Sequence, residues 1–455
     1  MPVRGQSPTP RPGMSAGSPN VYGRFHLALA ERLAARLYYG WVIVGVVIVS
    51  NLVAYSPNPT FGLFVTPLEQ EFGWSRSIIA GAQATGPVAG ALLAPLLGLL
   101  TDRLGIRTMM VSCALLAAGG YLILSRVSQA WQFYAAYGLI FAVMFSGCAL
   151  LMGNAAVSRW FRRRRGRAMG FITMGASGGG VLFIAVQTAL IAGVGWRGTY
   201  AVMALMPLLL ILLPALLLMV DTPAALGQEG HPELTGGGAD RHGTGAEHSF
   251  TVGEAVRTRA FWLTLPGVML GNFVVWGYFG HAVPHMENLG FSRPLASSVW
   301  ATFFVTGVVA KFGWGFLTEK LTVRWSVVFC LAAEAVGLYL LMNARSPADL
   351  FLYAVLNGLG HGPYLQLMAQ VWVDYFGPRS IGSIYGTIQP FFVAAGALGP
   401  LVGGLLFDRH GDYHAFFTVL VVATLAGAVI FAVNRPPRKA PAPVTAPPPA
   451  AGPPG

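Results

Sequence analysis

The chain has 455 residues, of which 55% are hydrophobic and only 10% are charged, and its net charge is +12. Soluble domains carry about 25% charged residues, so the composition excludes an ordinary soluble domain and predicts a polytopic membrane protein. The positive balance alone could suggest nucleic acid as a partner, but the charges lie between apolar runs of about 20 residues, the length of a membrane-spanning helix.

In chain order, the first element is a polar, basic tail at residues 1–37, which is rich in Pro, Gly and Ser and is predicted to be a disordered cytoplasmic segment. We expect no cleavable signal peptide, because the first apolar run is too long for one. The apolar runs that follow predict twelve membrane-spanning helices. They cover residues 39–67, 77–100, 107–126, 131–158, 167–193, 198–220, 260–287, 295–318, 325–343, 348–375, 380–406 and 413–434.

The largest polar interruption, residues 221–259, contains a glycine-rich stretch at 235–240 and is predicted to be a flexible cytoplasmic linker. It separates an N-terminal bundle of six helices at residues 38–220 from a C-terminal bundle of six helices at residues 260–434. The Pro- and Ala-rich tail at residues 435–455 is predicted to be disordered. The expected fold class is therefore an all-α membrane protein of two six-helix bundles.

Lys and Arg side chains set the expected orientation, because cytoplasmic loops are enriched in them. With both termini in the cytoplasm, the inner segments hold 22 of these residues and the outer loops hold six, while Lys311 lies within a predicted span. This distribution explains the net charge without nucleic acid and predicts a multi-pass protein of the cytoplasmic membrane. The three cysteines lie inside apolar runs and are expected to be buried, without a metal or disulfide role. They are Cys113, Cys148 and Cys330.

Ten residues of the first half return in the second half. The stretch Gly98-Leu-Leu-Thr-Asp-Arg-Leu-Gly-Ile-Arg107 matches Gly315-Phe-Leu-Thr-Glu-Lys-Leu-Thr-Val-Arg324 at an offset of 217 residues, with five of the ten positions identical. A hydrophobic chain that repeats at half its length is typical of secondary transporters built from two similar bundles. Each copy is expected to form an inner gate, because its acidic residue can face a helix N-terminus or pair with an Arg. The gate residues are Asp102, Arg103 and Arg107 in the first copy and Glu319, Lys320 and Arg324 in the second.

The first copy resembles the loop 2–3 signature of the major facilitator superfamily, and the second resembles its loop 8–9 counterpart, with Thr322 in place of the second Gly. Further stretches are similar to the monocarboxylate transporter branch, which includes bacterial members and the oxalate:formate antiporter group. They are Phe72-Gly-Trp-Ser-Arg76, Arg159-Trp-Phe161, Arg164-Arg-Gly-Arg-Ala168, His281-Ala-Val-Pro284, Leu289-Gly-Phe-Ser292, Asp374-Tyr-Phe-Gly377, Gly382-Ser-Ile-Tyr-Gly386, Gly399-Pro400 and Phe407-Asp408. The resemblance implies a substrate site between the two bundles near mid-membrane and access that alternates as the halves rock.

Lys311 is the most informative single residue. It lies about a third of the way up the eighth predicted span, where a Lys costs roughly 2.5–3.5 kcal/mol to insert. The cost is tolerated where the side chain faces a wet cavity and an anion, and the alternative is that it snorkels to the headgroups. The eight residues from Lys311 to Glu319 span about 12 Å of helix, a long reach for a lysine. The resemblance agrees, because monocarboxylate and oxalate carriers place a cation at this position.

The chain departs from that branch at three positions. Animal monocarboxylate transporters pair the cation with an Asp one turn earlier, where this chain has Gly307, and carry a Lys in the first span, where it has Asn58 or Pro59. The oxalate antiporter has a second Lys in span eleven, where this chain has Gln389 and its neighbours. One cation suits a monoanion better than a dianion, and the missing Asp argues against proton coupling of the family's type.

Polar residues near the middle of the cavity-lining spans are predicted to shape the substrate site. His361 leads them, since a His can bind an anion or carry a proton near neutral pH; a helix–helix hydrogen bond is the alternative. Glu334 lies on a predicted scaffold span, so it is expected to be a satisfied structural carboxylate first and a proton carrier second. The full predicted set is Lys311, His361, Gln389, Tyr55, Asn272, Asn51, Tyr278 and Tyr364, with Asn357 and Trp276 on the same spans.

Together these features predict a carrier of a small monocarboxylate-like organic anion that needs no cofactor and uses a proton or a counter-anion, in symport or antiport. No nucleotide loop, metal cluster or nucleophile–base motif indicates an enzyme. A multidrug or other solute antiporter of the same superfamily stays open as an alternative, as does a non-transporting membrane sensor. His281 and His285, one turn apart, suggest an outer gate rather than a metal site, because a metal would need a third ligand.

Overall fold

The computed structural model describes residues 30–35, 37–161, 164–229, 231–232, 250–317, 321–377 and 381–437. The predicted disordered tails fall largely at residues 1–29 and 438–455, outside the described residues. The glycine-rich part of the predicted linker and the gate residues Glu319 and Lys320 are also outside them.

Gly, Pro and Ser residues mark several of the helix ends and interruptions in the first half. The first predicted span is divided after residue 54, where Pro57 and Pro59 lack the backbone N–H that a continuous helix needs. Gly73, with φ of 64°, ends one helix, and the Ser75 side chain caps the next. Gly195, with φ of 70° and ψ of 173°, interrupts α9, which therefore holds parts of two predicted spans. The elements are α2 (Gly40–Ala54), α3 (Pro57–Thr60), α4 (Gly62–Phe72), α5 (Arg76–Leu104), α6 (Ile106–Ser125), α7 (Ala130–Phe141), η1 (Ala142–Leu150), α8 (Leu151–Trp160), α9 (Arg165–Met203), α10 (Leu205–Pro207), η2 (Leu208–Leu212) and α11 (Leu213–Leu218).

In the described part of the predicted linker, the short helices η3 and α13 precede the long helices of the second half. Ser346 caps α17 through a capping box with Asp349, and the turn at Gly362 and Pro363 divides the tenth predicted span into α17 and α18. The elements are η3 (Pro223–Leu226), α13 (Val252–Ala255), α14 (Arg259–Asn288), α15 (Arg293–Leu317), α16 (Val323–Met342), α17 (Pro347–His361), α18 (Tyr364–Phe376), α19 (Ile381–His410) and α20 (His414–Val433).

The protein is all-helical in character, and among the described residues nine helices are long and apolar enough to cross a membrane. The difference from the twelve predicted spans has a local cause. The candidate span at residues 167–218 covers two predicted spans, while the fourth and tenth predicted spans are interrupted by η1 and by the turn after α17. The number of crossings and the side on which the termini lie therefore stay predictions.

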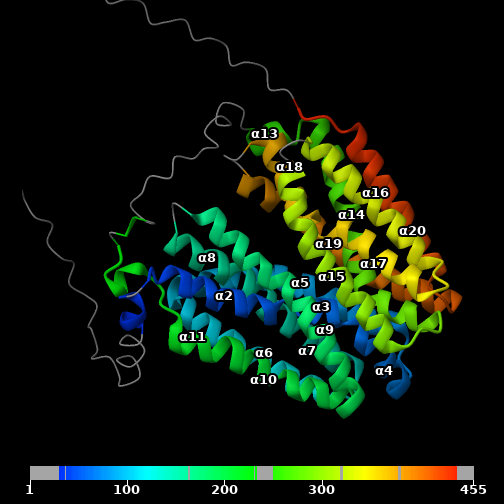
Figure 1. Ribbon diagram of the computed structural model, residues 1–455, viewed down its shortest axis with the longest axis horizontal. Helices are drawn as coiled ribbons and strands as arrows, with labels where there is room; N and C mark the ends of the chain where they lie inside the picture. The colour runs from blue at the N-terminus through cyan, green and yellow to red at the C-terminus, as the bar shows by residue number, and fades with distance from the viewer. Residues whose placement is uncertain are drawn as a thin grey trace, which may run out of the picture.

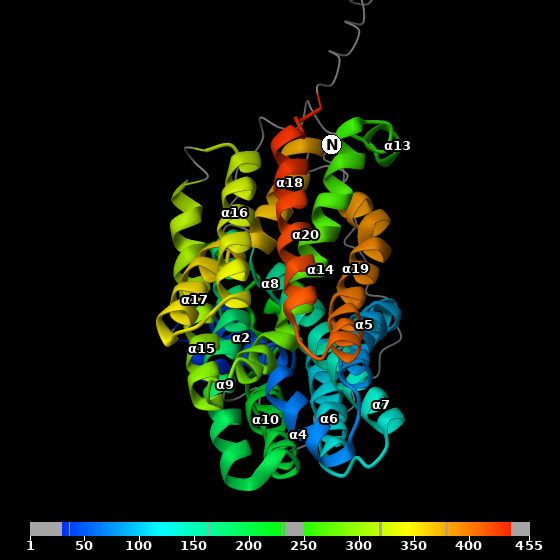
Figure 2. The same ribbon diagram turned by 90° about the vertical axis from the view of Figure 1, so that its right-hand side faces the viewer.

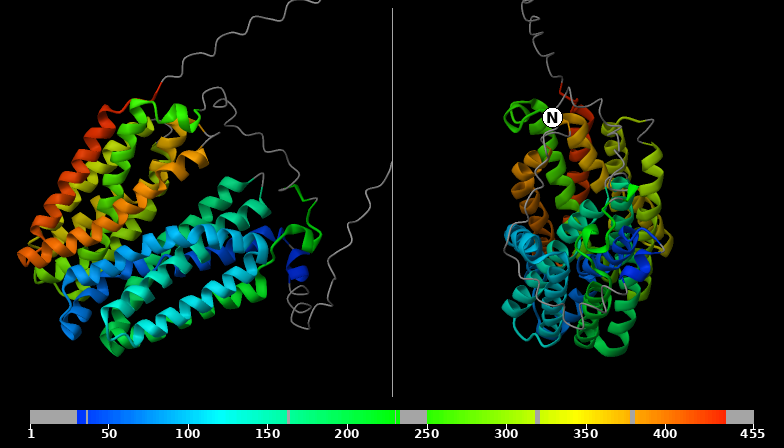
Figure 3. Two further views of the ribbon diagram at one scale, coloured as in Figure 1. Left: turned by 180° about the vertical axis from the view of Figure 1, so that it is seen from behind. Right: turned by 90° about the vertical axis from the view of Figure 1, so that its left-hand side faces the viewer.

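The helices form two halves that meet at one end and diverge at the other (Figure 1). The N-terminal half contains α2 to α11, and the C-terminal half contains α14 to α20. Figure 2 shows α14 and α20 side by side in the C-terminal half, with α4 and α6 below them. Across the interface, α5 packs on α19 and α9 packs on α15. The view from behind shows the same wedge, with α13 and the end of α20 at the wide side (Figure 3).

The apolar core continues through both halves, and all three cysteines lie buried in it as free thiols. Glycines allow the closest helix contacts of the C-terminal half. A Cβ atom on Gly362 would lie 2.4 Å from the backbone oxygen of Gly307, and one on Gly360 would lie 2.4 Å from that of Cys330. These contacts bring α15, α16 and α17 together at the level of His361, because only a residue without a side chain fits there.

Candidate functional site

Arg76 lies at the centre of the contacts that join the two halves at the narrow end, which we call the closed end. Its side chain belongs to the first turn of α5, and the residue is only 5% exposed. The carboxylate of Asp408 on α19 accepts a hydrogen bond from the backbone N–H of Arg76 at 2.9 Å and another from the next residue at 3.0 Å. The guanidinium lies 3.0 Å from Glu69, donates to Asn288 at 3.1 Å, and sits 3.7 Å from the centre of the Phe407 ring.

Further contacts close the same end. The Thr66 hydroxyl donates to the carboxylate of Glu287 across the interface at 2.6 Å. Glu287 also pairs with Arg293 in the first turn of α15, and the Trp300 indole N–H donates to the backbone oxygen of Pro59 at 2.8 Å. A Cβ atom on Gly404 would lie 2.5 Å from the Cα of Ser77, so α19 and α5 are in backbone contact here. The closed end is therefore held by charge, hydrogen bonds and a tight helix crossing.

Sequence reasoning did not identify these closing residues as a gate, although Arg76 belongs to one of the stretches that resemble the monocarboxylate transporter branch. The sequence does contain a pattern that marks these residues. Arg76 follows Gly73-Trp-Ser, and Arg293 follows Gly290-Phe-Ser at the offset of 217 residues that relates the two halves. Both glycines have positive φ, 64° and 89°, and each Arg pairs with a Glu at the end of the preceding helix. The repeat thus extends to the closed end.

The predicted gate residues lie at the wide end. Asp102 and Arg103, at the end of α5, are exposed. Arg107 binds within its own half, since its backbone N–H donates to Asp221 at 3.0 Å and its guanidinium donates to the backbone oxygen of Leu216 at 2.8 Å.

Arg324 makes the corresponding contact in the second half, where its guanidinium donates to the backbone oxygen of Ala432. In this conformation Arg107 and Arg324 therefore hold outer helices to their own bundles, and neither joins one half to the other. Their predicted partners Glu319 and Lys320 lie outside the described residues.

Lys311 lies on the side of α15 that faces the other half. Trp300 on this helix donates a hydrogen bond to the backbone oxygen of Pro59 in the N-terminal half. The ring of Phe304 packs against Gly180 of α9, where an added Cβ atom would lie only 2.6 Å from the ring. Lys311 follows Phe304 by seven residues, two turns of helix, and so continues the same face toward the wide end. The residue is half-buried. The lysine therefore lies two helical turns beyond Phe304, on the face of α15 that packs against the N-terminal half.

A cavity of about 110 Å³ lies between the halves on the opposite side of the interface. It is lined by α5, α7, η1, α14 and α19, and it is mainly apolar, with Phe141, Phe145 and Phe392 in its wall. Two residues of the predicted substrate set, Asn272 and Gln389, contribute polar groups. Ala94, the counterpart of Lys311 at the offset of 217 residues, also lines it, so the two halves place a methyl group and an ammonium group at related positions.

Several predicted substrate residues already hold helices together. Asn272 donates to the backbone oxygen of Phe392 at 2.6 Å and accepts from the indole of Trp276 at 3.0 Å. Asn51 donates to the backbone oxygen of Ile172 at 2.7 Å, and the Tyr364 hydroxyl donates to that of Val268 at 3.1 Å.

The remaining predicted aromatic residues differ in burial. Tyr55 is half-buried and packs edge-on against Phe145, a residue of the cavity wall. Tyr278 is fully buried, and its hydroxyl has no hydrogen-bond partner. Of the predicted set, Lys311, Gln389 and Tyr55 thus lie near the interface between the halves.

Glu334 and His361 are brought together by the packing of α16 on α17. A carboxylate oxygen of Glu334 lies 3.7 Å from Nδ1 of His361. Within the described part of the chain, neither carboxylate oxygen makes a hydrogen bond, and His361 is its nearest charged partner; the structural role expected for Glu334 stays a prediction. Sequence reasoning could not pair these residues, because they lie 27 positions apart on different helices.

His281 and His285 are buried structural residues of the C-terminal half. The two ring nitrogens of His281 bond to the Tyr413 hydroxyl at 3.1 Å and to the backbone oxygen of Pro400 at 2.9 Å, and His285 bonds to the backbone oxygen of Leu341 at 3.2 Å. The outer gate expected at this pair stays a prediction, and the contacts that join the two halves at the closed end lie around Arg76. In the described part of the chain, no group of three or more His, Cys, Asp or Glu could hold a metal ion.

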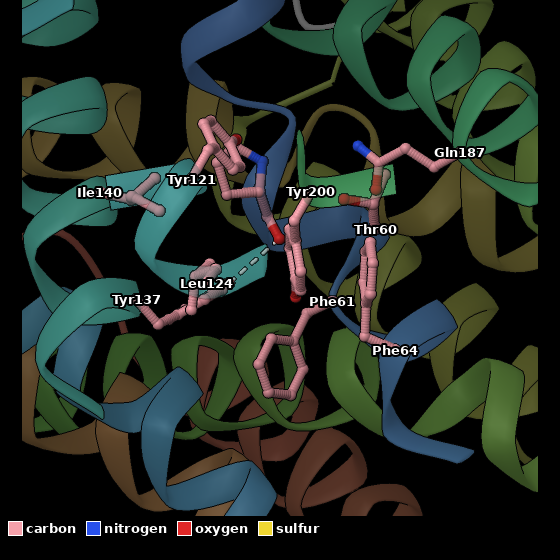
Figure 4. A pocket seen from close by; sticks show the side chains of 10 residues that line it. Thr60, Phe61, Phe64, Tyr121, Leu124, Tyr137, Ile140, Gln187 and Tyr200 are labelled. Carbon is pink, nitrogen blue, oxygen red and sulfur yellow. Dashed lines mark hydrogen bonds between the residues drawn. The ribbon is translucent and has the colours of Figure 1, made fainter. Parts of the chain in front are cut away.

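A small enclosed cavity of about 10 Å³ lies inside the N-terminal half and is separate from the interface (Figure 4). Phe61 and aromatic rings from α4, α6, α7 and α9 surround it, and the Tyr137 hydroxyl donates to the backbone oxygen of Pro57 at 3.0 Å. Tyr121 and Gln187 each present a polar atom without a hydrogen-bond partner. The cavity has room for about one water molecule, so it is too small for a substrate.

The sequence matches a known protein family and several individual proteins. The family model of the Major Facilitator Superfamily matches residues 43–285 and 268–453. The chain is 26% identical to the human "Monocarboxylate transporter 11" over 405 residues, 86% of this chain and 82% of that protein. It is 23% identical to the "Uncharacterized MFS-type transporter YcxA" of Bacillus subtilis over 413 residues, 86% of this chain and 94% of that protein.

Two solved structures have the same fold. A bacterial homologue of the human lysosomal transporter Spinster, in an inward-facing and unoccupied conformation, aligns with a TM-score of 0.64 at 17% identity and covers 88% of this chain and 96% of its own. The nucleoside transporter NupG aligns with a TM-score of 0.65 at 13% identity and covers 87% of this chain and 98% of its own. The matched relatives and neighbours are transporters.

Proposed function

The chain belongs to the Major Facilitator Superfamily, and from that premise we propose that it carries a small monocarboxylate across the cytoplasmic membrane by alternating access. As a member of this superfamily it is a membrane transporter and not an enzyme. The monocarboxylate assignment is supported by the human and animal relatives named for that substrate class.

The observation that carries the proposal is the position of Lys311. A lysine that faces the interface between two rocking halves is placed to meet an anion entering from the wide end. An ammonium inside the membrane is costly unless it finds water or a negative partner, so an anion that binds there is stabilised. One carboxylate matches one lysine in charge.

The interface cavity lined by α5, α14 and α19, on the side opposite Lys311, supports a substrate with an apolar part. Its wall is aromatic and aliphatic, and Gln389 is a polar group exposed on it. A ligand with a carboxylate held by Lys311 and an apolar portion that extends across the interface toward this cavity fits the usual pattern of ligand sites, in which few polar groups orient a mostly apolar ligand.

We assign the wide end to the cytoplasm and the closed end to the outside. The excess of Lys and Arg in the inner loops supports this orientation. The contacts around Arg76 and Asp408 would then form the outer gate. Asp102 and Arg103, with Glu319 and Lys320 of the second copy, would form the inner gate.

The test is uptake of radiolabelled pyruvate and lactate, then of a wider panel of organic anions and cationic drugs, in proteoliposomes. Lys311→Ala and the similarly sized neutral variant Lys311→Met should abolish anion uptake, while Lys311→Arg should keep part of it. Arg126→Met is the matched control, because Arg126 is an exposed cation at the end of α6. Undiminished uptake by Lys311→Ala would refute the anchor, and uptake of drugs instead of anions would favour a drug antiporter.

A further inference from the structure

A buried glutamine of the N-terminal half, Gln83, projects into the C-terminal half near the closed end. Gln83 belongs to α5, and only 1% of its surface is exposed. Its carbonyl oxygen, Oε1, lies against Gly280 of α14, where an added Cβ atom would be 2.1 Å from it. The oxygen therefore fills the space that a side chain at position 280 would need, and the contact crosses from one half to the other.

This contact lies between the closed end and the interface cavity. Arg76, at the centre of the closed end, precedes Gln83 by seven residues, about 10 Å along α5. Pro87, which lines the cavity, follows Gln83 by four residues, about 6 Å of helix. Gln83 thus belongs to the layer that separates the cavity from the closed end.

Contacts on both sides hold this arrangement in place. The amide nitrogen of Gln83 donates a hydrogen bond to Oδ1 of Asn58 at 2.9 Å. Asn58 belongs to α3, so this bond ties α5 to the interrupted first span within the N-terminal half. Gly62 of α4 packs against the backbone oxygen of Gly280, where an added Cβ atom would lie at 3.2 Å. Gly280 is therefore enclosed by α4 and α5 of the other half.

The carbonyl oxygen of Gln83 makes no hydrogen bond with the described part of the chain. A buried amide oxygen without a donor has lost the hydrogen bonds that it makes in water, and this loss is unfavourable. The group of Gly280 that faces it is a Cα–H, which is a much weaker donor than an N–H group. The closed conformation therefore contains a polar group that would be more stable in water.

Separation of the halves at the closed end would change the surroundings of this oxygen. Gly280 would move away with the C-terminal half, whereas Asn58 would move together with Gln83, since both belong to the N-terminal half. Water would then reach the oxygen and restore its hydrogen bonds. The unpaired oxygen thus lowers the stability of the closed conformation alone, and it opposes the contacts of Arg76 and Asp408 that stabilise this conformation.

We propose that Gln83 is a positioning residue for alternating access, which keeps the closed end able to open. Its side chain fills the layer between the cavity and the closed end, and its unpaired oxygen limits how stable that layer is. The inference rests on the alternation between conformations in the proposed function and is independent of the substrate. A transport cycle needs both conformations to be populated, so a closed end without any unfavourable contact would slow it.

The substitution Gln83→Met removes the unpaired oxygen and keeps the packing. Methionine is flexible and similar in length, so it can still fill the space at Gly280. Asn58 is half-buried, and water can replace its lost hydrogen bond in either conformation. The ratio of open to closed molecules should therefore fall roughly fivefold or more. Gln83→Glu should have the opposite effect, because a carboxylate is still less favourable than an amide when it is buried.

Gln187 supplies a matched control. It is also a buried glutamine, with 2% of its surface exposed, and its carbonyl oxygen makes no hydrogen bond with the described residues. It lines the small cavity inside the N-terminal half, which is separate from the interface (Figure 4). Gln187→Met should therefore change the Tm of the protein but leave the ratio of open to closed molecules unchanged.

The measurement is the distance between spin labels at Ser128 and Arg345, which are exposed loop positions of the two halves at the closed end. It is made by pulsed electron paramagnetic resonance without substrate, on variants that gel filtration shows to be folded. The population with the longer distance should shrink in Gln83→Met and grow in Gln83→Glu. In proteoliposomes with radiolabelled lactate and pyruvate, Gln83→Met should lower kcat several-fold, because fewer molecules open to the outside.

The outcomes separate this inference from the substrate assignment. An unchanged distance distribution in both Gln83 variants, or a larger open population in Gln83→Met, would refute the role of Gln83. An equal shift in Gln187→Met would also refute it, since the effect would then come from packing in general. The expected distance changes without any uptake of lactate or pyruvate would support the role of Gln83 and count against the monocarboxylate assignment alone.

Discussion

Removing the Asp408 carboxylate should open the closed end of the protein. Asp408 caps α5 by accepting hydrogen bonds from two successive backbone N–H groups at 2.9 and 3.0 Å, and it does so from the other half of the molecule. In Asp408→Ala the two N–H groups lack a hydrogen-bond partner in the closed conformation. In the open conformation they bond to water in the variant and the wild type alike, so the substitution destabilises the closed conformation alone.

The magnitude follows from the contact. Loss of a helix N-cap costs about 0.5–2 kcal/mol. Asp408 is exposed, so water competes with the interaction and the lower part of that range applies. A loss of about 1 kcal/mol shifts the equilibrium between closed and open conformations roughly fivefold. Asp408→Asn should shift it less, since its amide oxygen still accepts a hydrogen bond.

The assay is a distance measurement by pulsed electron paramagnetic resonance. Spin labels on cysteines introduced at Ser128 and Arg345 report on the closed end, because both positions are exposed in loops there, one in each half. The population with a longer distance between labels should grow in Asp408→Ala. Asp412→Ala is the matched control, since Asp412 is also exposed but binds only His414 in its own half. An unchanged distribution in Asp408→Ala, or an equal change in Asp412→Ala, would refute the reasoning.

Three further predictions concern single contacts. Gly404→Leu should prevent closure, because even the Cβ atom of the new side chain would lie 2.5 Å from the Cα of Ser77. Transport should be lost while the protein stays folded, and normal transport would contradict the tight helix crossing. Asn272→Leu should lower stability by about 1–3 kcal/mol, seen as a reduced Tm in detergent, because it removes the bonds to Phe392 and Trp276. The hydrogen bond from Arg197 lowers the pKa of the Glu71 carboxyl. The stability this pair adds is therefore present above the unfolded-state pKa of Glu71 and lost as pH falls below it. At neutral pH, the free energy of unfolding of Glu71→Gln should be lower than that of the wild type by at most about 1 kcal/mol, and in acid the two should be equal. A loss of stability in Glu71→Gln that persists in acid would argue against the ion pair.

The sequence by itself determined the class of protein, its superfamily and its most informative residue. Apolar runs, the repeat of Gly98–Arg107 at Gly315–Arg324 and a single lysine within a span are local features, and helices in a membrane follow from local composition because every backbone group must bond within its own segment. The interruptions at Pro57 and Gly195 also have local causes.

Only the tertiary structure decided which residues meet. Asp408 reaches Arg76 across 332 positions, and Glu334 reaches His361 on a neighbouring helix. Asn272 and Asn51 were predicted to bind substrate, yet each bonds to the backbone of another helix. A polar residue in a span can face substrate, a neighbouring helix or a buried carboxylate, and its sequence neighbours are the same in all three cases. The choice depends on how the helices cross, which is set at distant glycines such as Gly360 and Gly404, where one backbone rests directly on another.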